Sequence, residues 1–341
     1  MSTPTRDAVA HLAALRERQA DLGDWLEREP PPLDYVLPHL LAGTIGVLYA
    51  PGGRGKGFFL LQAAIAVACC GPGADPMELG LSGHGRAVYI SAEDPAIVLH
   101  HRFRAMCAGM PPATREELRE RLSIVPAYAL GIDVGSPAWC DALAQYCDGA
   151  RFVVLDTFRR VHHAEENSNG EMADIMGRVE PIAAKTGAAI LLAHHVNKAG
   201  EAARGATAII DNARCGMSLV TLQTDASGLK EMLRAHKFSV TRGGKALPEA
   251  AAHRFVRIEF AKVNYGHIVE EVDGQRWLER GEGGVLHAVT LYPADAAGTE
   301  GGRAKKAKTE FAKSGSGTGA VGAPGSARRG GKATEGEDDW D

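Results

Sequence analysis

The sequence has little of what marks membrane proteins and disulfide-rich secreted proteins. No apolar run approaches the ~20 residues of a transmembrane helix, and no signal peptide is visible. The six cysteines include no CxxC pair and no spacing typical of a zinc site. We therefore expect a cytoplasmic protein with reduced cysteines and no membrane partner.

A strong net charge is missing as well. The formal net charge is −4 at pH 7, so the chain as a whole does not attract nucleic acid and any basic surface must be local. Apolar residues make up 45% of the 341 residues, which is enough for a large core. This length accommodates an α/β domain of roughly 200–250 residues with tails.

The most informative stretch is TIGVLYAPGGRGKGFF, residues 44–59. Residues 44–50 form an apolar run of strand length, and a helical apolar pattern starts at Phe58. A strand, a glycine-rich turn, a lysine and a helix together form a typical triphosphate site, because backbone N–H groups and the helix N-terminus surround the phosphates. The alternative is an ordinary glycine-rich strand–helix turn. The predicted phosphate-binding residues are Pro51, Gly52, Gly53, Arg54, Gly55, Lys56, Gly57 and Phe58.

The match to the pattern G-x-x-x-x-G-K-[ST] is incomplete. Ala50 stands at the first glycine position, and Gly57 stands where a Ser or Thr hydroxyl normally ligates Mg²⁺. Two consequences remain open. Either water takes the place of the hydroxyl, or ATP binding survives while hydrolysis slows.

Further apolar runs of strand length alternate with helical patterns. Strands are predicted at residues 88–90, 122–127, 151–157 and 188–195, and helices at 97–110, 139–146, 171–185 and 206–212. This alternation predicts an α/β fold with a mostly parallel sheet, whose ligands bind at the carboxyl ends of the strands. Later runs at 217–222, 238–241, 255–263, 276–279 and 285–292 are expected to extend the sheet antiparallel.

Polar residues gather at the predicted carboxyl ends of the strands. Asp156 ends an apolar strand, where its carboxylate can hold Mg²⁺ or a metal-bound water beside the phosphates. Glu93 is suited to polarise a water for attack on the γ-phosphoryl group, and Asp94 is its rival. Helix N-capping is the alternative for all three carboxylates.

Composition divides the chain into three parts. Residues 1–29 form a helical or flexible arm with one amphipathic or frayed helix, which three prolines at 30–32 stop. Residues 30–292 form the α/β domain. Residues 293–341 are rich in Gly, Ala and Lys and end in EGEDDWD, so they are expected to be disordered.

Eight segments taken together resemble a known family. They are PPPLDYVLP, APGGRGKG, YISAEDP, LHHRFRAM, VVLDTFRRVHHAEEN, LLAHHVNKA, ARGATAIIDNARC and KVNYG. They are similar, in the same order, to segments of the RepA family, the hexameric replicative DNA helicases of IncQ-type broad-host-range plasmids. The resemblance runs from about residue 30 to residue 286. It implies a RecA-like P-loop NTPase core that uses ATP and Mg²⁺.

The resemblance also implies roles for individual residues. Lys56 would hold the β- and γ-phosphates, and Asp156 would coordinate Mg²⁺ through water. Glu93 would be the catalytic base, and His195 would sense the γ-phosphate. Arg214 would be an arginine finger that enters the site of a neighbouring subunit.

The resemblance implies partners as well. Single-stranded DNA would pass through a ring, which is hexameric in this family, and meet residues 197–203 with Lys198 and Arg204. A plasmid primase and initiator proteins are further expected partners. Arg102 and Lys262 are additional phosphate or subunit-interface candidates. The rivals to the helicase reading are a poorly hydrolysing ATP- and DNA-binding relative and a filament-forming, RecA-like recombination or regulatory ATPase.

Overall fold

The computed structural model describes residues 6–166, 168–196, 204–221, 238–240, 245–246, 249–265 and 275–293. The expected DNA loop at 197–203, with Lys198, lies outside these described residues. So does the predicted disordered tail beyond residue 293. The division into three parts therefore stays a prediction.

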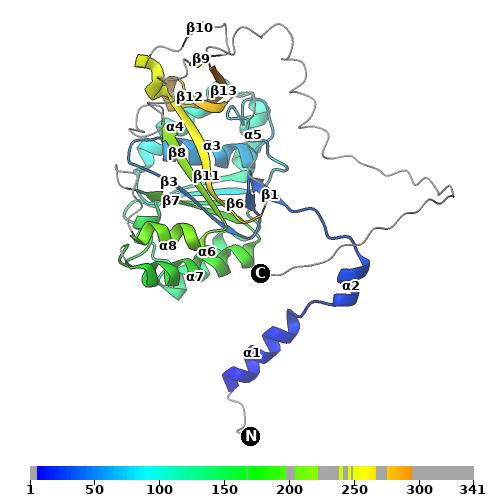
Figure 1. Ribbon diagram of the computed structural model, residues 1–341. Helices are drawn as coiled ribbons and strands as arrows, with labels where there is room; N and C mark the ends of the chain where they lie inside the picture. The colour runs from blue at the N-terminus through cyan, green and yellow to red at the C-terminus, as the bar shows by residue number, and fades with distance from the viewer. Residues whose placement is uncertain are drawn as a thin grey trace, which may run out of the picture. The chain divides into compact units, whose positions relative to one another are not determined.

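A large mixed sheet organises the domain (Figure 1). Its order within the described residues is β10-β9-β13-β12-β11-β8-β3-β7-β6-β4-β5. The six strands that run parallel are β8 (Cys215–Thr221), β3 (Ile45–Ala50), β7 (Ala189–His195), β6 (Phe152–Asp156), β4 (Ala87–Ser91) and β5 (Leu122–Pro126). The antiparallel strands are β11 (Phe255–Val263), β12 (Gln275–Arg280), β13 (Leu286–Pro293), β9 (Phe238–Val240) and β10 (Lys245–Ala246). The predicted α/β fold with a mostly parallel central sheet is confirmed.

One strand direction differs from the expectation. The run at 217–222 was expected to be antiparallel, but β8 pairs with β3 in parallel, with Cys215 opposite Gly46. Helix α8 (Arg204–Asn212) follows β7 and precedes β8 along the chain, as the crossover between two parallel strands requires. The antiparallel part therefore begins one strand later, at β11.

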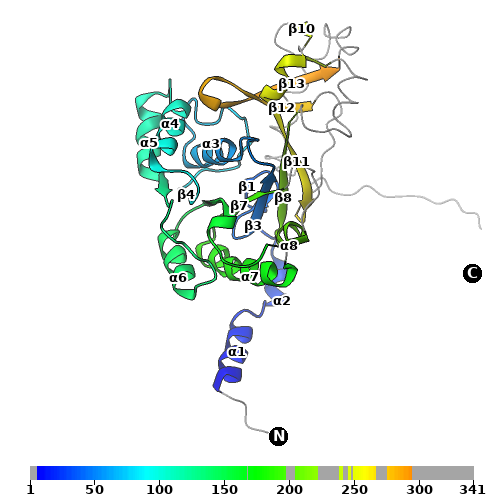
Figure 2. The same ribbon diagram turned by 90° about the vertical axis from the view of Figure 1, so that its left-hand side faces the viewer.

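The two faces of the parallel strands bury separate apolar cores. Because side chains alternate along a strand, Phe152 and Val154 face one core while Val153 and Leu155 face the other. Figure 2 shows α3, α4 and α5 on one face and α6, α7 and α8 on the other. The bounds of the helices not yet given are α3 (Lys56–Ala68), α4 (Ala96–Met106), α5 (Pro112–Arg121), α6 (Pro137–Tyr146) and α7 (Asn169–Thr186).

The N-terminal arm departs from the single helix that was expected. It holds two helices, α1 (Arg6–Glu17) and α2 (Leu22–Glu27). The break has a local cause, since the Asp21 carboxylate accepts hydrogen bonds from the N–H groups of Gly23 and Asp24 and so starts a new helix. No side chain of α2 is buried.

The remaining elements are short. A small hairpin of β1 (Tyr35–Leu37) and β2 (Leu40–Leu41) precedes β3. Three 3₁₀ turns, Phe158–Arg160, Glu249–Arg254 and Glu282–Gly284, complete the described structure. None of the helices in the described ranges is long and apolar enough to cross a membrane.

Phe152 provides a test of the core beneath α3. Its side chain is 0% exposed, so Phe152→Ala is expected to lower the free energy of unfolding by about 3–5 kcal/mol through lost burial and a residual cavity. Urea denaturation measures the change. Leu130→Ala, at a side chain that is 54% exposed, is the control and should change stability little. Equal effects of the two substitutions would contradict this placement of the core.

Candidate nucleotide-binding site

The turn between β3 and α3 has the backbone shape of a phosphate-binding loop. Gly53 and Gly55 have φ angles of 78° and 91°, which residues with a side chain rarely adopt. Gly55 caps α3, and the helix begins at Lys56, two residues before its apolar pattern starts. The loop therefore leads directly into a helix N-terminus, whose free N–H groups favour an anion.

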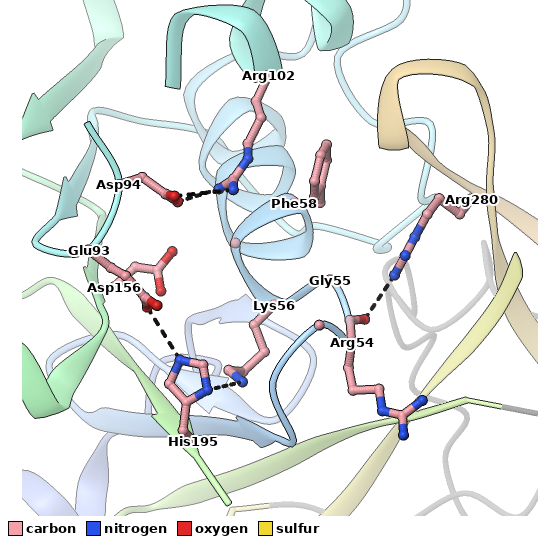
Figure 3. Close-up of a pocket in the computed structure, with 12 residues that line it drawn as sticks. Arg54, Gly55, Lys56, Phe58, Glu93, Asp94, Arg102, Asp156, His195 and Arg280 are labelled. Atoms are coloured by element: carbon pink, nitrogen blue, oxygen red, sulfur yellow. Dashed lines mark hydrogen bonds and ion pairs between the residues drawn. The ribbon is translucent and has the colours of Figure 1, made fainter. Parts of the chain in front are cut away.

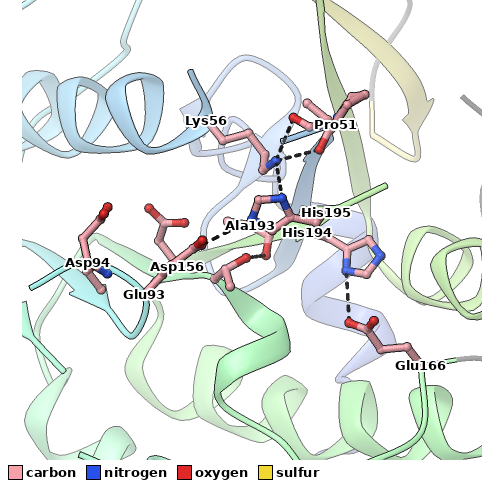
Figure 4. A network of polar contacts seen from close by, with 12 residues as sticks. Pro51, Lys56, Glu93, Asp94, Asp156, Glu166, Ala193, His194 and His195 are labelled. Carbon is pink, nitrogen blue, oxygen red and sulfur yellow. Dashed lines mark hydrogen bonds and ion pairs between the residues drawn. The ribbon is translucent and has the colours of Figure 1, made fainter. Parts of the chain in front are cut away.

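Lys56 is the central cation of the site (Figure 4). Its side chain comes from the first turn of α3 and is only 5% exposed. The ammonium donates hydrogen bonds to Ala50 O at 2.6 Å and Pro51 O at 3.3 Å, and lies 3.2 Å from His195 Nδ1. Burial lowers the pKa of Lys56 to about 8, since the charged form loses hydration.

His195 joins Lys56 to Glu93. It stands at the end of β7, paired in register with Ala50 at the end of β3. Because an ammonium group can only donate, His195 Nδ1 accepts from Lys56, and the ring proton lies on Nε2. Nε2 then donates to Glu93 Oε2 at 3.3 Å. The predicted sensor and the predicted base are thus in direct contact, although they are 102 residues apart in the chain.

Asp156 lies in the same pocket but in a drier environment. It ends β6, opposite Ser91 at the end of β4, and is 5% exposed. The Tyr89 hydroxyl donates a hydrogen bond to Asp156 Oδ2. Burial raises the pKa of Asp156, and the nearby charges of Glu93 and Asp94 raise it further. Tyr89 was not predicted from the sequence as a site residue, although strand alternation places it on the α3 side of β4.

The structure distinguishes the two rival carboxylates at 93 and 94. Asp94 makes a two-contact ion pair with Arg102 of α4, at 2.5 Å and 3.3 Å. Both oxygens of Asp94 therefore accept hydrogen bonds from the Arg102 guanidinium, whereas Glu93 contacts His195 beside Lys56. This favours Glu93 as the group that meets a water.

A second guanidinium reaches the loop from the antiparallel part of the sheet. Arg280, at the end of β12, donates from Nη2 to Arg54 O at 3.1 Å (Figure 3). Arg54 in turn donates to the Thr221 hydroxyl at the end of β8, at 2.9 Å. Arg280 was not selected from the sequence, since it lies 226 residues from its partner and belongs to no motif.

Most of the residues predicted for the nucleotide site line one pocket (Figure 3). Its lining residues are Gly53, Arg54, Gly55, Lys56, Gly57, Phe58, Glu93, Asp94, Arg102, Asp156, His195 and Arg280. Pro51 and Gly52 do not line it, although Pro51 O accepts from Lys56.

Arg214 lies away from this pocket. Its backbone N–H donates to Ile45 O, at the start of β3, whereas the phosphate-binding loop follows the end of that strand. The six residues of β3 separate the two positions by roughly 15–20 Å. The guanidinium is half exposed and lies 3.8 Å from Glu180 Oε1. Arg214 is therefore not part of the nucleotide pocket of its own chain.

Lys262, another candidate, is also remote from the pocket. Its ammonium donates to the carbonyl oxygens of Ile210 and Asp211 at the end of α8. Cations at a helix C-terminus satisfy free carbonyls and complement the helix dipole. Lys262 therefore has a helix-capping role in this structure, and the phosphate role is not supported.

The residues present fit a nucleotide with its metal ion. Positive-φ glycines, a helix N-terminus and Lys56 suit a triphosphate. The carboxylates of Glu93 and Asp156 are the hard oxygen donors that Mg²⁺ prefers, although Gly57 supplies no hydroxyl. No group of three or more His, Cys, Asp or Glu that would hold a metal by itself occurs in the described ranges. Mg²⁺ would thus be held jointly with the phosphates.

A comparison with protein families agrees with this geometry. A family model described as "AAA domain" matches residues 13–201, which is more than half of the chain. The chain belongs to this AAA domain family. The match includes the phosphate-binding loop, Glu93, Asp156 and His195, and it ends before Arg214. The AAA domain protein is therefore a P-loop ATPase by family, and its candidate nucleotide site lies at the carboxyl edge of the parallel strands.

The lowered pKa of Lys56 makes ATP binding dependent on pH. Bound phosphates stabilise the ammonium and raise this pKa again, so binding takes up protons near pH 8 and ATP affinity falls as pH rises above the free value of about 8. The loss approaches about tenfold per pH unit. Calorimetry in buffers of different ionisation enthalpy measures the uptake.

Lys56→Arg provides the matched control, because a guanidinium stays charged over this range. Its ATP affinity should be nearly independent of pH between about 7 and 9. If both proteins show the same pH dependence, another group titrates and Lys56 is not the source.

Proposed function

We propose that this AAA domain protein is an ATP-driven, ring-forming replicative DNA helicase of the RepA family, acting in plasmid replication. The observation that carries the proposal is the meeting of four groups from separate elements in one pocket. Lys56, Glu93, Asp156 and His195 lie where a triphosphate, its metal ion and an attacking water would be handled together. The family-like segments seen in the sequence select a DNA helicase from the many P-loop ATPases.

Each group has a physical task in hydrolysis. Lys56 binds the β- and γ-phosphates, which draw its ammonium from the carbonyl oxygens that now accept from it. Glu93 accepts a proton from the attacking water and orients it in line with the phosphorus. His195 contacts both Lys56 and Glu93. Because these two residues meet the γ-phosphate and the attacking water, the position of His195 changes when the γ-phosphate is lost. Mg²⁺, when bound, neutralises charge on the leaving phosphates.

The position of Arg214 favours an assembly in which subunits share sites. Its guanidinium is 48% exposed and far from the pocket of its own chain, so it is available to a neighbour's nucleotide. An arginine supplied in trans raises turnover by about 10³–10⁵-fold in other P-loop enzymes. The proposal therefore includes a hexameric ring around single-stranded DNA, with a plasmid primase and initiator proteins as further partners.

Gly57 favours one alternative function. A protein that binds ATP and assembles on DNA, but hydrolyses slowly, would tolerate the missing hydroxyl at the metal site. Restoring the hydroxyl with Gly57→Ser tests it, since turnover should then rise greatly. A RecA-like filament is distinguished from a ring by electron microscopy with an ATP analogue.

ATPase assays with and without single-stranded DNA test the motor. Turnover should be stimulated by DNA and should support unwinding of a forked duplex. Lys56→Ala is expected to lose ATP binding. Glu93→Gln is expected to keep ATP binding while turnover falls about 10²–10⁴-fold, because the amide cannot accept the proton. Full turnover by Glu93→Gln, or no effect of DNA on the wild-type protein, would contradict the proposal.

Mixing two inactive variants tests the shared site. Lys56→Ala and Arg214→Ala should each be nearly inactive alone. In mixed rings, an intact Lys56 of one subunit meets an intact Arg214 of the next, so equimolar mixing should restore a measurable fraction of turnover. A mixture no more active than its components would show that Arg214 does not act in trans.

A further inference from the structure

The space beside Gly57 is already filled. A Cβ atom at this position would lie 3.0 Å from Arg102 Nη1 and 3.1 Å from Asp156 Oδ2, which is closer than most Cβ contacts. The Tyr89 hydroxyl lies 3.7 Å from the same point. A Ser or Thr side chain, which most P-loop enzymes carry here, would therefore push against the Arg102 guanidinium.

Arg102 is held in this place by two further contacts. Asp94 binds its guanidinium through both oxygens, at 2.5 Å and 3.3 Å. The guanidinium carbon also lies 5.0 Å from the centre of the Phe58 ring, within the range of a cation–π contact. Because the side chains of Arg102 and Asp94 are only 22% and 23% exposed, this geometry is restrained and partly shielded from water (Figure 3).

The chemistry of the guanidinium suits a phosphate. It keeps its positive charge at every accessible pH and presents five N–H donors in a planar fork. Asp94 engages one donor on Nη1 and one on Nη2, so the other N–H donors of this pocket-lining side chain are not used by Asp94. The point beside Gly57 that lies 3.0 Å from Arg102 Nη1 lies 3.1 Å from Asp156 Oδ2, the carboxylate that would hold the metal.

We propose that the Arg102 guanidinium neutralises part of the phosphate charge that a hydroxyl-held Mg²⁺ would otherwise neutralise. This protein then binds ATP with substantial affinity when no divalent metal is present. The missing side chain at Gly57 makes room for this guanidinium. This role of Arg102 rests on the proposed ATP site. It adds to that proposal the residue that compensates the negative charge of the phosphates. Mg²⁺ then adds less to ATP binding than in an enzyme with Ser or Thr after the lysine.

Equilibrium binding of ATP in Mg²⁺ and in EDTA tests this without any need for turnover. Wild-type protein should bind ATP in EDTA within about tenfold of its affinity in Mg²⁺. Arg102→Met keeps much of the side-chain volume but removes the charge, and should bind about 10–100-fold more weakly in EDTA. Arg102→Lys retains the charge as a second variant and should fall between the two.

The reciprocal substitution makes the test sharper. Gly57→Ser combined with Arg102→Met supplies the hydroxyl and removes the guanidinium, so ATP binding should become strong in Mg²⁺ and weak in EDTA. Gly57→Ser alone should weaken binding in EDTA by displacing Arg102. Arg104→Ala, at an exposed position of the same helix, is the control and should leave both affinities unchanged.

The outcomes separate this inference from the proposed function. Wild-type binding that requires Mg²⁺, or an unchanged ratio of the two affinities in Arg102→Met, would overturn the role of Arg102 and leave the ATPase proposal standing. No ATP binding in either buffer would overturn both. Thermal melting of each variant without nucleotide confirms that the compared proteins are folded.

Discussion

The ammonium group of Lys56 is held almost out of contact with solvent, with two backbone carbonyls and one imidazole as its partners. Its three N–H donors all have acceptors, but burial removes hydration from the charge, and this unfavourable loss lowers the pKa of Lys56. An anion in the adjacent loop would relieve it. The buried ammonium is therefore arranged to gain more from a triphosphate than an exposed lysine would.

The register of the parallel strands brings the other groups to this cation. Ala50 pairs with His195 across β3 and β7, and Ser91 pairs with Asp156 across β4 and β6. Strands that run in the same direction end at the same edge, so residues distant in the chain become neighbours there. The antiparallel strands contribute to the pocket too, because β12 carries Arg280 to the carbonyl of Arg54. Arg280 thus joins the antiparallel part of the sheet to the candidate site.

The balance of charge within the pocket follows from this convergence. Four cationic side chains and three carboxylates line the same space as His195. The carboxylates are not equivalent. Asp156 is buried and accepts a hydrogen bond from the Tyr89 hydroxyl. Asp94 forms an ion pair with Arg102, and Glu93 contacts His195 beside Lys56. One sheet edge thereby gives three similar groups three different chemical environments.

Much of this protein can be read from its sequence for simple physical reasons. Runs of apolar residues at 44–50 and 188–195 predict buried strands, and the glycine-rich turn before Lys56 requires backbone angles that only glycine adopts readily. Helix α5 was missed because only Thr114 and Leu118 are buried on an otherwise charged segment. The parallel direction of β8 was missed because strand periodicity is the same in both directions.

Local pattern therefore determined the strands, the phosphate-binding loop and the side chains at the strand ends, since each depends on neighbours in the chain. Tertiary structure alone decided which of those side chains meet. The contact of Arg280 with the loop, the bond between Tyr89 and Asp156, and the guanidinium beside Gly57 join residues from separate elements. Such contacts depend on sheet order and helix packing, and no periodicity within one segment encodes them.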